Sequence, residues 1–372
     1  MNIAVIGAGI VGLATARAAA MAGHKVSVFE RSSRALGASV RNFGMFWPLG
    51  QSGANFQLAL RSASAWKQIA SDTGLWLQQH GALLPAYEVS EQELMHEFIE
   101  TKSRQDGYQL QWLSAAEALA FSPMLQANGL CGALHSQTEM LINPREAIPQ
   151  VQNWIASKYQ VNFHFSTPVV SVAGHQLLTA SGATHHFDHV FVCSGADFEW
   201  LFPEEHRASG IQICKLQMMR TAPVKQHLGL PVVGPLSLAF YDAFATCKSW
   251  QPLRQQMEAK YPAYFQHGIH VMAAQHHDGS ITIGDSHQYA QELGPFDEVL
   301  IRKLILDYLG GLLQIPDMQI AETWQGVYAK IPGKSALISS VNPITTIVNA
   351  LGGSGMTLSF ALAEDVVADV LA

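Results

Sequence analysis

The stretch Asn2-Ile-Ala-Val-Ile-Gly-Ala-Gly-Ile-Val-Gly12, with Lys25-Val-Ser-Val-Phe-Glu30 shortly after it, decides the fold of this chain. Its apolar, β-branched start predicts a buried parallel strand over 2–6. An alanine-rich helix is expected over 13–21 and a second strand over 25–29. The order strand, glycine turn, helix, strand, acidic residue is the dinucleotide-binding fingerprint in the context that it requires.

Each glycine of this fingerprint has a physical task. Gly7 allows the tight turn, Gly9 lets the backbone approach a pyrophosphate, and Gly12 lets the helix lie close to the strand. Ile10 and Val11 belong to the glycine turn before the expected helix, whose N-terminus offers free N–H groups and a partial positive charge to phosphate. We therefore expect all five residues to contact or shape the cofactor site.

The residues after the second strand separate FAD from NAD. Glu30 can accept hydrogen bonds from ribose hydroxyls, which disfavours the 2′-phosphate of NADP. The segment Gly37-Ala-Ser-Val-Arg-Asn-Phe-Gly44 that follows is rich in small residues and glycine. Such a backbone can make a second phosphate contact and pass close under a flat ring, which favours FAD.

Two further blocks have the same character. Asn349-Ala-Leu-Gly-Gly-Ser-Gly-Met-Thr357 precedes an expected amphipathic helix over 356–371, and a glycine-rich helix start is a second site for negative charge. His189-Val-Phe-Val-Cys-Ser-Gly-Ala196 has the pattern of a strand that ends in a turn of small residues.

Together these blocks resemble the D-amino-acid oxidase superfamily of flavoproteins, which includes glycine oxidase and sarcosine oxidase. The resemblance implies FAD as cofactor, with a backbone contact to adenine from one of two valines. Beyond the fingerprint, it points to the following FAD-binding residues: Arg31, Ser39, Arg41, Asn42, Gly44, Met45, Val169, Val170, Ser194, Gly195, Gly352, Gly353, Ser354, Gly355, Met356 and Thr357. The segments 284–289 and 324–330 show a weaker resemblance to a subgroup associated with phosphonate breakdown.

The expected fold class is α/β, with a Rossmann-like FAD-binding domain and a second, α+β substrate domain built on an antiparallel sheet. With 372 residues the chain exceeds the roughly 250–300 at which a single core stops growing. We expect a discontinuous FAD-binding domain over 1–85, 143–210 and 325–372, and a substrate domain over 86–142 and 211–324. In the latter, strands are expected over 212–221, 270–275 and 280–284, with one helix over 253–265.

Composition excludes several classes of protein. Lys and Arg number 22 against 29 Asp and Glu, a net charge of −7, so no basic field favours nucleic acid as a partner. No uninterrupted apolar stretch approaches the ~20 residues that span a bilayer. The apolar N-terminus lacks a basic leader, and the four cysteines form no C-x-x-C pair. We therefore expect free thiols in a cytoplasmic protein.

The sixteen histidines raise the question of a metal site. His185, His186 and His189 cluster, as do His276 and His277, but neither group has nearby cysteines and both adjoin expected strand edges or turns. We interpret them as surface histidines and expect no metal.

The resemblance also bears on substrate binding. Relatives hold a substrate carboxylate with Arg or Lys, but Tyr328 stands where glycine oxidases have Arg, and Ser359 is near the place of the sarcosine oxidase Lys. Lys330 follows Tyr328 by two and so shares its face of a strand. We take Tyr328 and Lys330 as the anchor for the substrate's acidic group. The other cations that could serve are Arg41, Lys215, Arg220, Lys248 and Lys334.

Two residues are candidates to meet the substrate amine, Asp285 and His287. The sarcosine oxidase attachment cysteine has its place here near Gly326, so the FAD is expected to be non-covalent. The lysine that speeds the reaction with oxygen in those enzymes has its place near Thr282. O2 is the expected electron acceptor, and the choice between oxidase and dehydrogenase stays open.

The leading hypothesis is an FAD-dependent oxidation of a small amine that carries an acidic group, an amino acid or an aminophosphonate, with or without an N-methyl group. A hydride passes to the flavin, and the resulting imine hydrolyses to a carbonyl plus ammonia or methylamine. One alternative is oxidation of a 2-hydroxy acid or a phosphorylated alcohol, which also occurs on this fold. Another is a flavin-binding subunit without turnover of its own.

Overall fold

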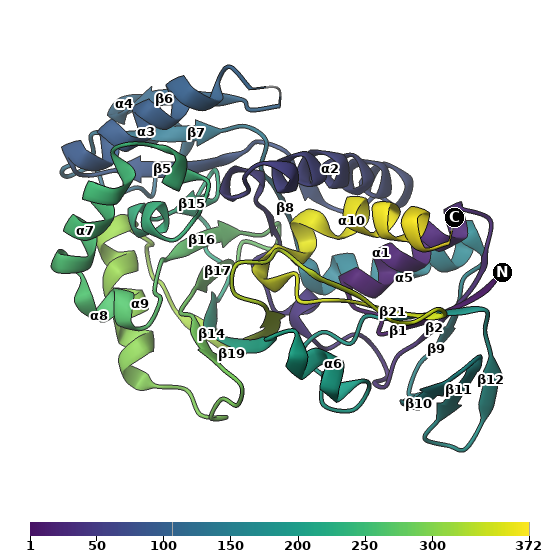
Figure 1. Ribbon diagram of the computed structural model, residues 1–372. Coiled ribbons are helices and arrows are strands. Elements are labelled where there is room, and N and C mark those ends of the chain that lie inside the picture. The colour runs from purple at the N-terminus through teal and green to yellow at the C-terminus, as the bar shows by residue number, and fades with distance from the viewer. Residues whose placement is uncertain (106, 372) are drawn as a thin grey trace.

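The computed structural model describes residues 1–105 and 107–371. Two bodies lie side by side, each built on its own sheet, and both chain termini lie in the first (Figure 1). Within the described ranges, no helix combines the length and the apolar character needed to cross a membrane.

The first body is a mainly parallel sheet covered on both faces. Its strands follow the order β20 (Leu337–Asn342), β21 (Thr345–Asn349), β13 (His189–Val192), β1 (Asn2–Ile6), β2 (Lys25–Phe29) and β9 (Asn162–His164). Only the β20–β21 hairpin is antiparallel. One side carries the helices α1 (Ile10–Met21), α2 (Ala54–Thr73), α5 (Pro144–Tyr159) and α10 (Gly355–Val370). The other carries α6 (Pro203–Ala208) and a small sheet of β10 (Val169–Ala173), β11 (Gln176–Thr179) and β12 (Thr184–His186).

The first thirty residues form the predicted strand, helix and strand. β1 is buried over Ile3–Ile6 and pairs in parallel with β2 and β13. Gly12 explains how α1 reaches the sheet, because a Cβ there would overlap the carbonyl oxygen of Gly7. The expected Rossmann-like unit is confirmed, and its Gly7 and Gly12 are required by close backbone contacts.

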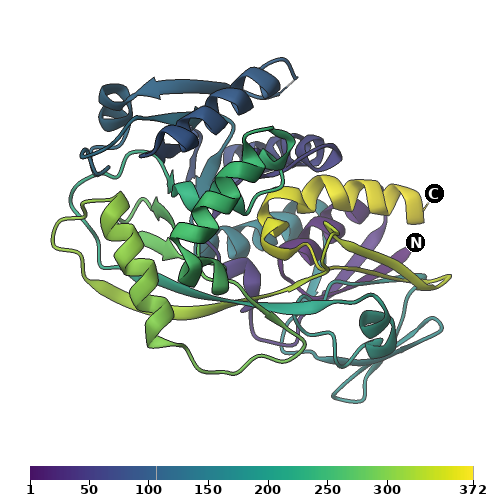
Figure 2. The same cartoon turned by 60° about the vertical axis from the view of Figure 1, so that its left-hand side comes forward.

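The second body is a mainly antiparallel sheet, which confirms the expected fold class. Its strands follow the order β18 (Gln288–Ala290), β14 (Gln212–Thr221), β17 (Ile281–Gly284), β16 (Met272–Gln275), β15 (Val232–Val233), β5 (Ala82–Ala86), β7 (Gly132–Ser136) and β6 (Leu110–Ser114), with β19 (Ile320–Lys330) paired to β14. One apolar core joins this sheet to α4 (Ala115–Phe121) and α9 (Val299–Leu312), and another joins it to α3 (Val89–Lys102) and α7 (Trp250–Lys260). Figure 2 shows α9 on the outside of this body.

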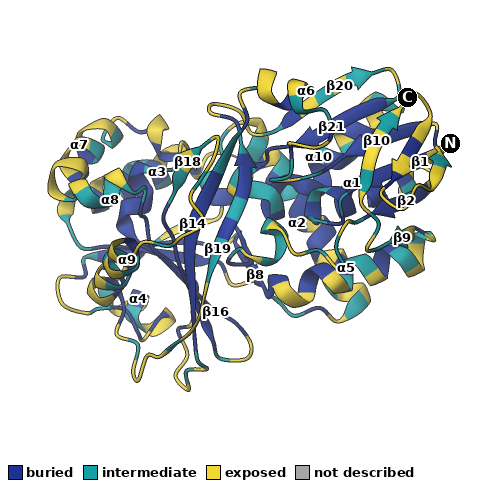
Figure 3. Cartoon of the chain, turned by 90° about the horizontal axis from the view of Figure 1, so that it is seen from below, coloured by how far each residue is buried: buried dark blue, intermediate teal, exposed yellow. Residues whose placement is uncertain are grey.

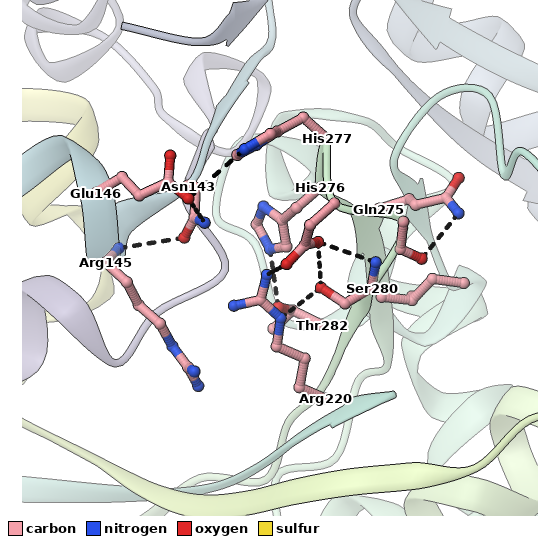
Figure 4. A network of polar contacts seen from close by, with 12 residues as sticks. Asn143, Arg145, Glu146, Arg220, Gln275, His276, His277, Ser280 and Thr282 are labelled. Atoms are coloured by element: carbon pink, nitrogen blue, oxygen red, sulfur yellow. Dashed lines mark hydrogen bonds and ion pairs between the residues drawn. The ribbon is translucent and has the colours of Figure 1, made fainter. Parts of the chain in front are cut away.

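The long strands β14 and β19 run between the two bodies, and β14 is buried along most of its length (Figure 3). Polar contacts fasten the start of α5 to the second body. Arg145 pairs with Glu322 of β19 at 2.6 Å and lies over the ring of Trp324. Glu146 faces His277 at 3.6 Å (Figure 4). A short sheet of β3 (Met45–Phe46), β8 (Met140–Ile142) and β4 (Leu77–Gln78) also connects the bodies.

Two expectations about helices were wrong. The single helix expected over 253–265 is two helices, α7 and α8 (Pro262–Gln266), because Pro262 has no N–H to continue the first and instead starts the second. Helix α9 was not predicted, although the spacing of Ile301, Ile305 and Leu309, all buried, is helical.

Strand β19 pairs with β14 as one continuous strand, so it crosses the domain boundary expected at residue 325.

The expectation of surface histidines was wrong for His189 and His276, which are 4% and 3% exposed. Each ring lies against a neighbouring strand and shares a hydrogen bond with a threonine hydroxyl, Thr346 at 3.1 Å and Thr282 at 2.9 Å. Burial lowers the pKa of His189 to about 4 and that of His276 to about 3. Both are therefore neutral residues of the packed interior, whereas His186 and His277 are exposed as expected.

Candidate functional site

A cavity of 1280 Å³ lies where the two bodies meet, and both contribute to its walls. Its size exceeds the roughly 300–1,000 Å³ typical of a small-molecule pocket. One end is formed by the glycine turn after β1 and the start of α1, the other by side chains of β19 and the loop after β17. The arrangement has room for a dinucleotide together with a small second ligand.

The glycine turn presents backbone groups to the cavity. Gly7 has φ +103°, and a Cβ there would overlap the carbonyl oxygen of Cys193 on the next strand. Gly9 is the N-cap residue of α1 and has no side chain to cap the helix. The N–H of Ile10, the first residue of the helix, donates to Ser39 Oγ at 2.9 Å. This helix start suits a phosphate group.

Glu30 lies at the end of β2 and lines the same end of the cavity. Its Oε2 accepts from the N–H of Ala8 at 3.0 Å and its Oε1 from the N–H of Ser32 at 3.0 Å. Each carboxylate oxygen can accept a second hydrogen bond. Glu30 is thus held beside the glycine turn with capacity left for hydroxyl donors, and its contact to ribose stays a prediction.

The C-terminal glycine block reaches the cavity at its middle. A 3₁₀ turn over Gly352–Ser354 leads into α10, whose first residues have no side-chain cap. Gly353 lies against the Tyr328 ring, so that a Cβ would stand 3.8 Å from the hydroxyl. A second helix start therefore faces the cavity beside a predicted substrate residue.

The predicted cofactor residues fall into two sets. Those that line the cavity are Gly7, Gly9, Ile10, Val11, Glu30, Arg31, Ser39, Arg41, Asn42, Met45, Ser194, Gly195, Gly352, Gly353, Ser354, Gly355, Met356 and Thr357. Among the described residues, the others stand off its walls: Gly12, Gly44, Val169 and Val170.

The two glycines outside the cavity serve packing. Gly44 has φ +75°, and a Cβ there would overlap the carbonyl oxygen of Ile142, just as one at Gly12 would overlap that of Gly7. The two valines lie in β10, on the small separate sheet, and Val170 is exposed. Their contact to adenine stays a prediction.

The second end of the cavity gathers all four predicted substrate residues: Tyr328, Lys330, Asp285 and His287. Strand pairing explains this, because β14 pairs on one side with β19, opposite Tyr328, and on the other with β17 and β18, which flank Asp285 and His287. The same end holds residues that sequence reasoning missed, namely Tyr241, His270 and Tyr289.

Lys330 lies near the ring of Tyr289. Its Nζ lies 5.9 Å from the centre of the Tyr289 ring, and its stem packs beside Gly352. Tyr328 is buried, and burial raises its pKa well above the ordinary value. Its hydroxyl therefore stays protonated and can donate a hydrogen bond to an anion that the lysine attracts.

The carboxylate of Asp285 is 4% exposed, and its Oδ1 has no hydrogen-bond partner among the described residues. Burial raises its pKa to about 6, while the nearby His287 acts to lower it. His287 Nδ1 lies 3.9 Å from Oδ1 and donates to the carbonyl of Gly268 at 2.9 Å. His270 stacks on His287 and shares a hydrogen bond with Ser237 at 3.2 Å.

His270, Asp285 and His287 also offer atoms within 4.8 Å of one another, as a metal site would. The rings of His270 and His287, however, stack nearly parallel, at 4.8 Å between centres with 9° between planes. Ring lone pairs lie in the ring planes, so parallel rings cannot direct both to one ion. The absence of a metal stays our prediction.

Other sequence candidates lie elsewhere. Lys215 is buried and donates to the carbonyls of Gly294 and Phe296, and Arg220 pairs with Asp278 at 2.9 Å (Figure 4). With Lys248, they stand outside the cavity walls in the part of the chain that the structure describes. Arg41 and Lys334, by contrast, do line the cavity.

The cavity wall bears on the predicted mode of FAD attachment. Gly326, at the place of the attachment cysteine, lines the cavity and carries no thiol. Cys193 also lines it, but burial raises the pKa of this thiol to about 12, which disfavours the reactive thiolate. Thr282, at the place of the lysine that speeds the reaction with oxygen, is not part of the described cavity wall and shares a hydrogen bond with His276. Non-covalent binding remains the prediction that these residues favour.

Comparison with known proteins connects this geometry to a family. A family model described as "FAD dependent oxidoreductase" (DAO) matches residues 2–369. Glycine oxidase from Geobacillus kaustophilus (strain HTA426) is 26% identical over 208 residues, 52% of this chain and 54% of the relative. The match thus spans about half the length of that curated relative.

Solved structures share the fold along the whole chain. L-proline dehydrogenase from P. horikoshii has a TM-score of 0.80 at 21% identity, with 98% of this chain and 91% of that chain covered. Glycine oxidase from Geobacillus kaustophilus has 0.77 at 19%, with 99% and 94% covered. Iminodiacetate oxidase from Chelativorans sp. BNC1 has 0.74 at 18%, with 99% and 95% covered.

Proposed function

The chain belongs to the DAO family of FAD-dependent oxidoreductases, and on that premise we propose that it oxidises a small amine that also carries an acidic group. FAD, when bound, supplies the hydride acceptor. The described residues fit this cofactor, because two helix starts and a glycine turn that excludes a Cβ line the cavity, with Glu30 held beside them.

One observation carries the proposal, the presence of opposite charges at the second end of the cavity. Lys330 lies on β19 near the Tyr289 ring, and the buried Asp285 lies across the sheet in the loop after β17. A ligand with an anionic group and an ammonium group can pair with both. Pairing would relieve the unfavourable burial of an unpartnered carboxylate oxygen.

The anionic end favours a particular class of acidic group. An Arg fork matches a planar carboxylate in two parallel bonds, whereas Lys acts as a point charge without that geometry. Lys330 with the Tyr328 hydroxyl suits a tetrahedral anion as well as a planar one. We therefore propose that aminophosphonates, or longer amino acids, are better substrates than glycine or alanine.

The relatives are consistent with an amine substrate. The names glycine oxidase, L-proline dehydrogenase and iminodiacetate oxidase all describe amino-acid-like amines. A hydroxy acid or a phosphorylated alcohol would satisfy Lys330 but would bring no cation for Asp285. This difference favours the amine over the alcohol. We further propose that the amine becomes an imine that hydrolyses to a carbonyl, with O2 as the electron acceptor.

Anaerobic bleaching of the bound flavin tests the proposal directly. The panel contains aminophosphonates, amino acids, their N-methyl derivatives, 2-hydroxy acids and uncharged amines. We expect bleaching by amines with an acidic group, and an aldehyde or keto product together with ammonia or methylamine. Bleaching by hydroxy acids alone would contradict the proposal, and a flavin that no compound bleaches would identify a subunit without turnover.

A further inference from the structure

We propose that Asp285 accepts the proton of the substrate's ammonium group, so that the amine is neutral when it is oxidised. This inference rests on the proposed function, because it requires an amine as substrate. It starts from the buried Oδ1 of Asp285, which has no hydrogen-bond partner among the described residues although its side chain lines the cavity. An anionic atom in that state lacks a counter-charge, and an ammonium group would supply one.

The protein itself provides no cation for this carboxylate. No lysine or arginine of the described chain lies within ion-pair distance of Asp285, and the His287 ring lies 3.9 Å from it. The other titratable groups that face it come from several packed elements: His270 before β16, Tyr241, Cys214 of β14, Tyr289 of β18 and Tyr328 of β19.

These neighbours are neutral. Burial raises the pKa of Tyr241, Tyr289 and Tyr328 above their ordinary value and that of Cys214 to about 12. Burial, with the positive charge of Lys330, lowers the pKa of His270 well below its ordinary value. Among Asp285 and these five neighbours, Asp285 is therefore the charged group at neutral pH.

Burial distinguishes Asp285 from His270 as a proton acceptor. A histidine that takes a proton becomes a cation, which the buried site disfavours. An aspartate that takes a proton becomes neutral, which the same burial favours, and this is why the pKa of Asp285 rises to about 6. In addition, His287 already donates one ring N–H to Gly268 and His270 is engaged with Ser237.

The step is a proton transfer without redox change. One N–H bond of the ammonium group breaks, one O–H bond forms at the carboxylate, and the products are a neutral amine and a carboxylic acid. At pH 7 the unliganded carboxylate is mostly ionised, so it can both attract the ammonium group and take its proton. Loss of both charges together is more favourable in a site with little water than in solution.

The pH dependence of kcat/KM tests the proposal, with the FAD-loaded enzyme and the best amine from the bleaching panel. The wild type should show an acidic limb near pH 6, where Asp285 becomes protonated, and a plateau above it. Asp285→Asn should lose about 100-fold at pH 7. Its kcat/KM should then climb with pH toward the pKa of the free amine, because only amine already neutral in solution can react.

Two further variants and the flavin itself provide controls. Asp242→Asn removes an exposed carboxylate that lines the same cavity and should keep the acidic limb. Asp285→Glu should restore the limb in part. FAD content and the flavin spectrum show whether each variant is folded.

The proposal would be overturned if kcat/KM of Asp285→Asn depended on pH as in the wild type, whether or not its value were lower. That result would show that Asp285 takes no proton. A flavin that no amine bleaches at any pH is a different result. That result would refute the proposed function, and the inference with it.

Discussion

The two ends of the cavity are built in different ways. At the cofactor end, backbone atoms form most of the site. The key positions lie within thirty consecutive residues, from β1 through α1 to Glu30. At the substrate end, side chains form the site, and they come from segments far apart in the sequence, such as those of Tyr241, Asp285 and Lys330. The first end is specified by steric limits on glycine and the second by the charge and burial of single groups. The first should fail through loss of the cofactor, the second through changes in rate, specificity and pH dependence.

The largest effect should come from Gly12→Ala. A Cβ at this position would overlap the carbonyl oxygen of Gly7, so α1 must move away from β1 or the turn must open. We expect a protein that is isolated without flavin colour and unfolds at a lower temperature. Gly310→Ala is the matched control, since a Cβ there meets no atom within 4 Å and the residue stands outside the cavity walls, and it should retain FAD. Equal flavin content in the two variants would show that close packing of α1 does not determine cofactor binding.

At the substrate end, Asp285→Asn should stabilise the protein in the absence of substrate. The pKa of Asp285 is raised to about 6 in the folded state from 3.8, so the folded state binds the proton more tightly than the unfolded state. Stability from this group is present below pH 4 and is lost as pH rises through 6. Above that pH the unpaired carboxylate costs at most about 3 kcal/mol. Thermal unfolding should show a gain for the variant at pH 8 that shrinks toward pH 4, and a gain independent of pH would contradict this assignment.

Glu30→Ala should weaken FAD binding and leave the fold intact. The carboxylate accepts from Ala8 and Ser32 and has capacity for ribose hydroxyls. Losing hydrogen bonds to a charged group costs about 1.5–3 kcal/mol, or roughly ten- to hundredfold in affinity. Titration of the apoprotein with FAD measures the change, while circular dichroism reports the fold. An unchanged dissociation constant would remove Glu30 from the cofactor site.

Lys330→Ala should lower kcat/KM roughly tenfold for an amine with an acidic group, since one charged contact is lost. An uncharged amine of similar size should be affected little, which separates a lost anchor from a general loss of structure. Lys334→Ala is the matched variant for comparison, because it removes the same charge from another part of the cavity wall. If both substrates lose equally in Lys330→Ala, the anchor must be sought at Arg41 or Lys334.

The cofactor end could be predicted from the sequence because its signals are local. Gly7, Gly9, Gly12 and Glu30 stand at fixed spacings within one strand–turn–helix–strand unit, and the structure places each as that unit requires. Tyr328, Lys330, Asp285 and His287 could be named because each stands beside a recognisable segment. The sequence does not predict that these four residues lie close together, because their proximity depends on how β14 pairs with β17, β18 and β19.

What the sequence by itself determined is therefore the dinucleotide-binding unit and the family, because steric demands on glycine act between residues that are close in the chain. Only the tertiary structure decided that His270 and Tyr241 join the site, that His189 and His276 are buried and neutral, and that Asp285 Oδ1 has no hydrogen-bond partner among the described residues. The physical reason is that desolvation and unpaired charge depend on every neighbour in space. Those neighbours are brought together by the pairing of strands from distant parts of the chain.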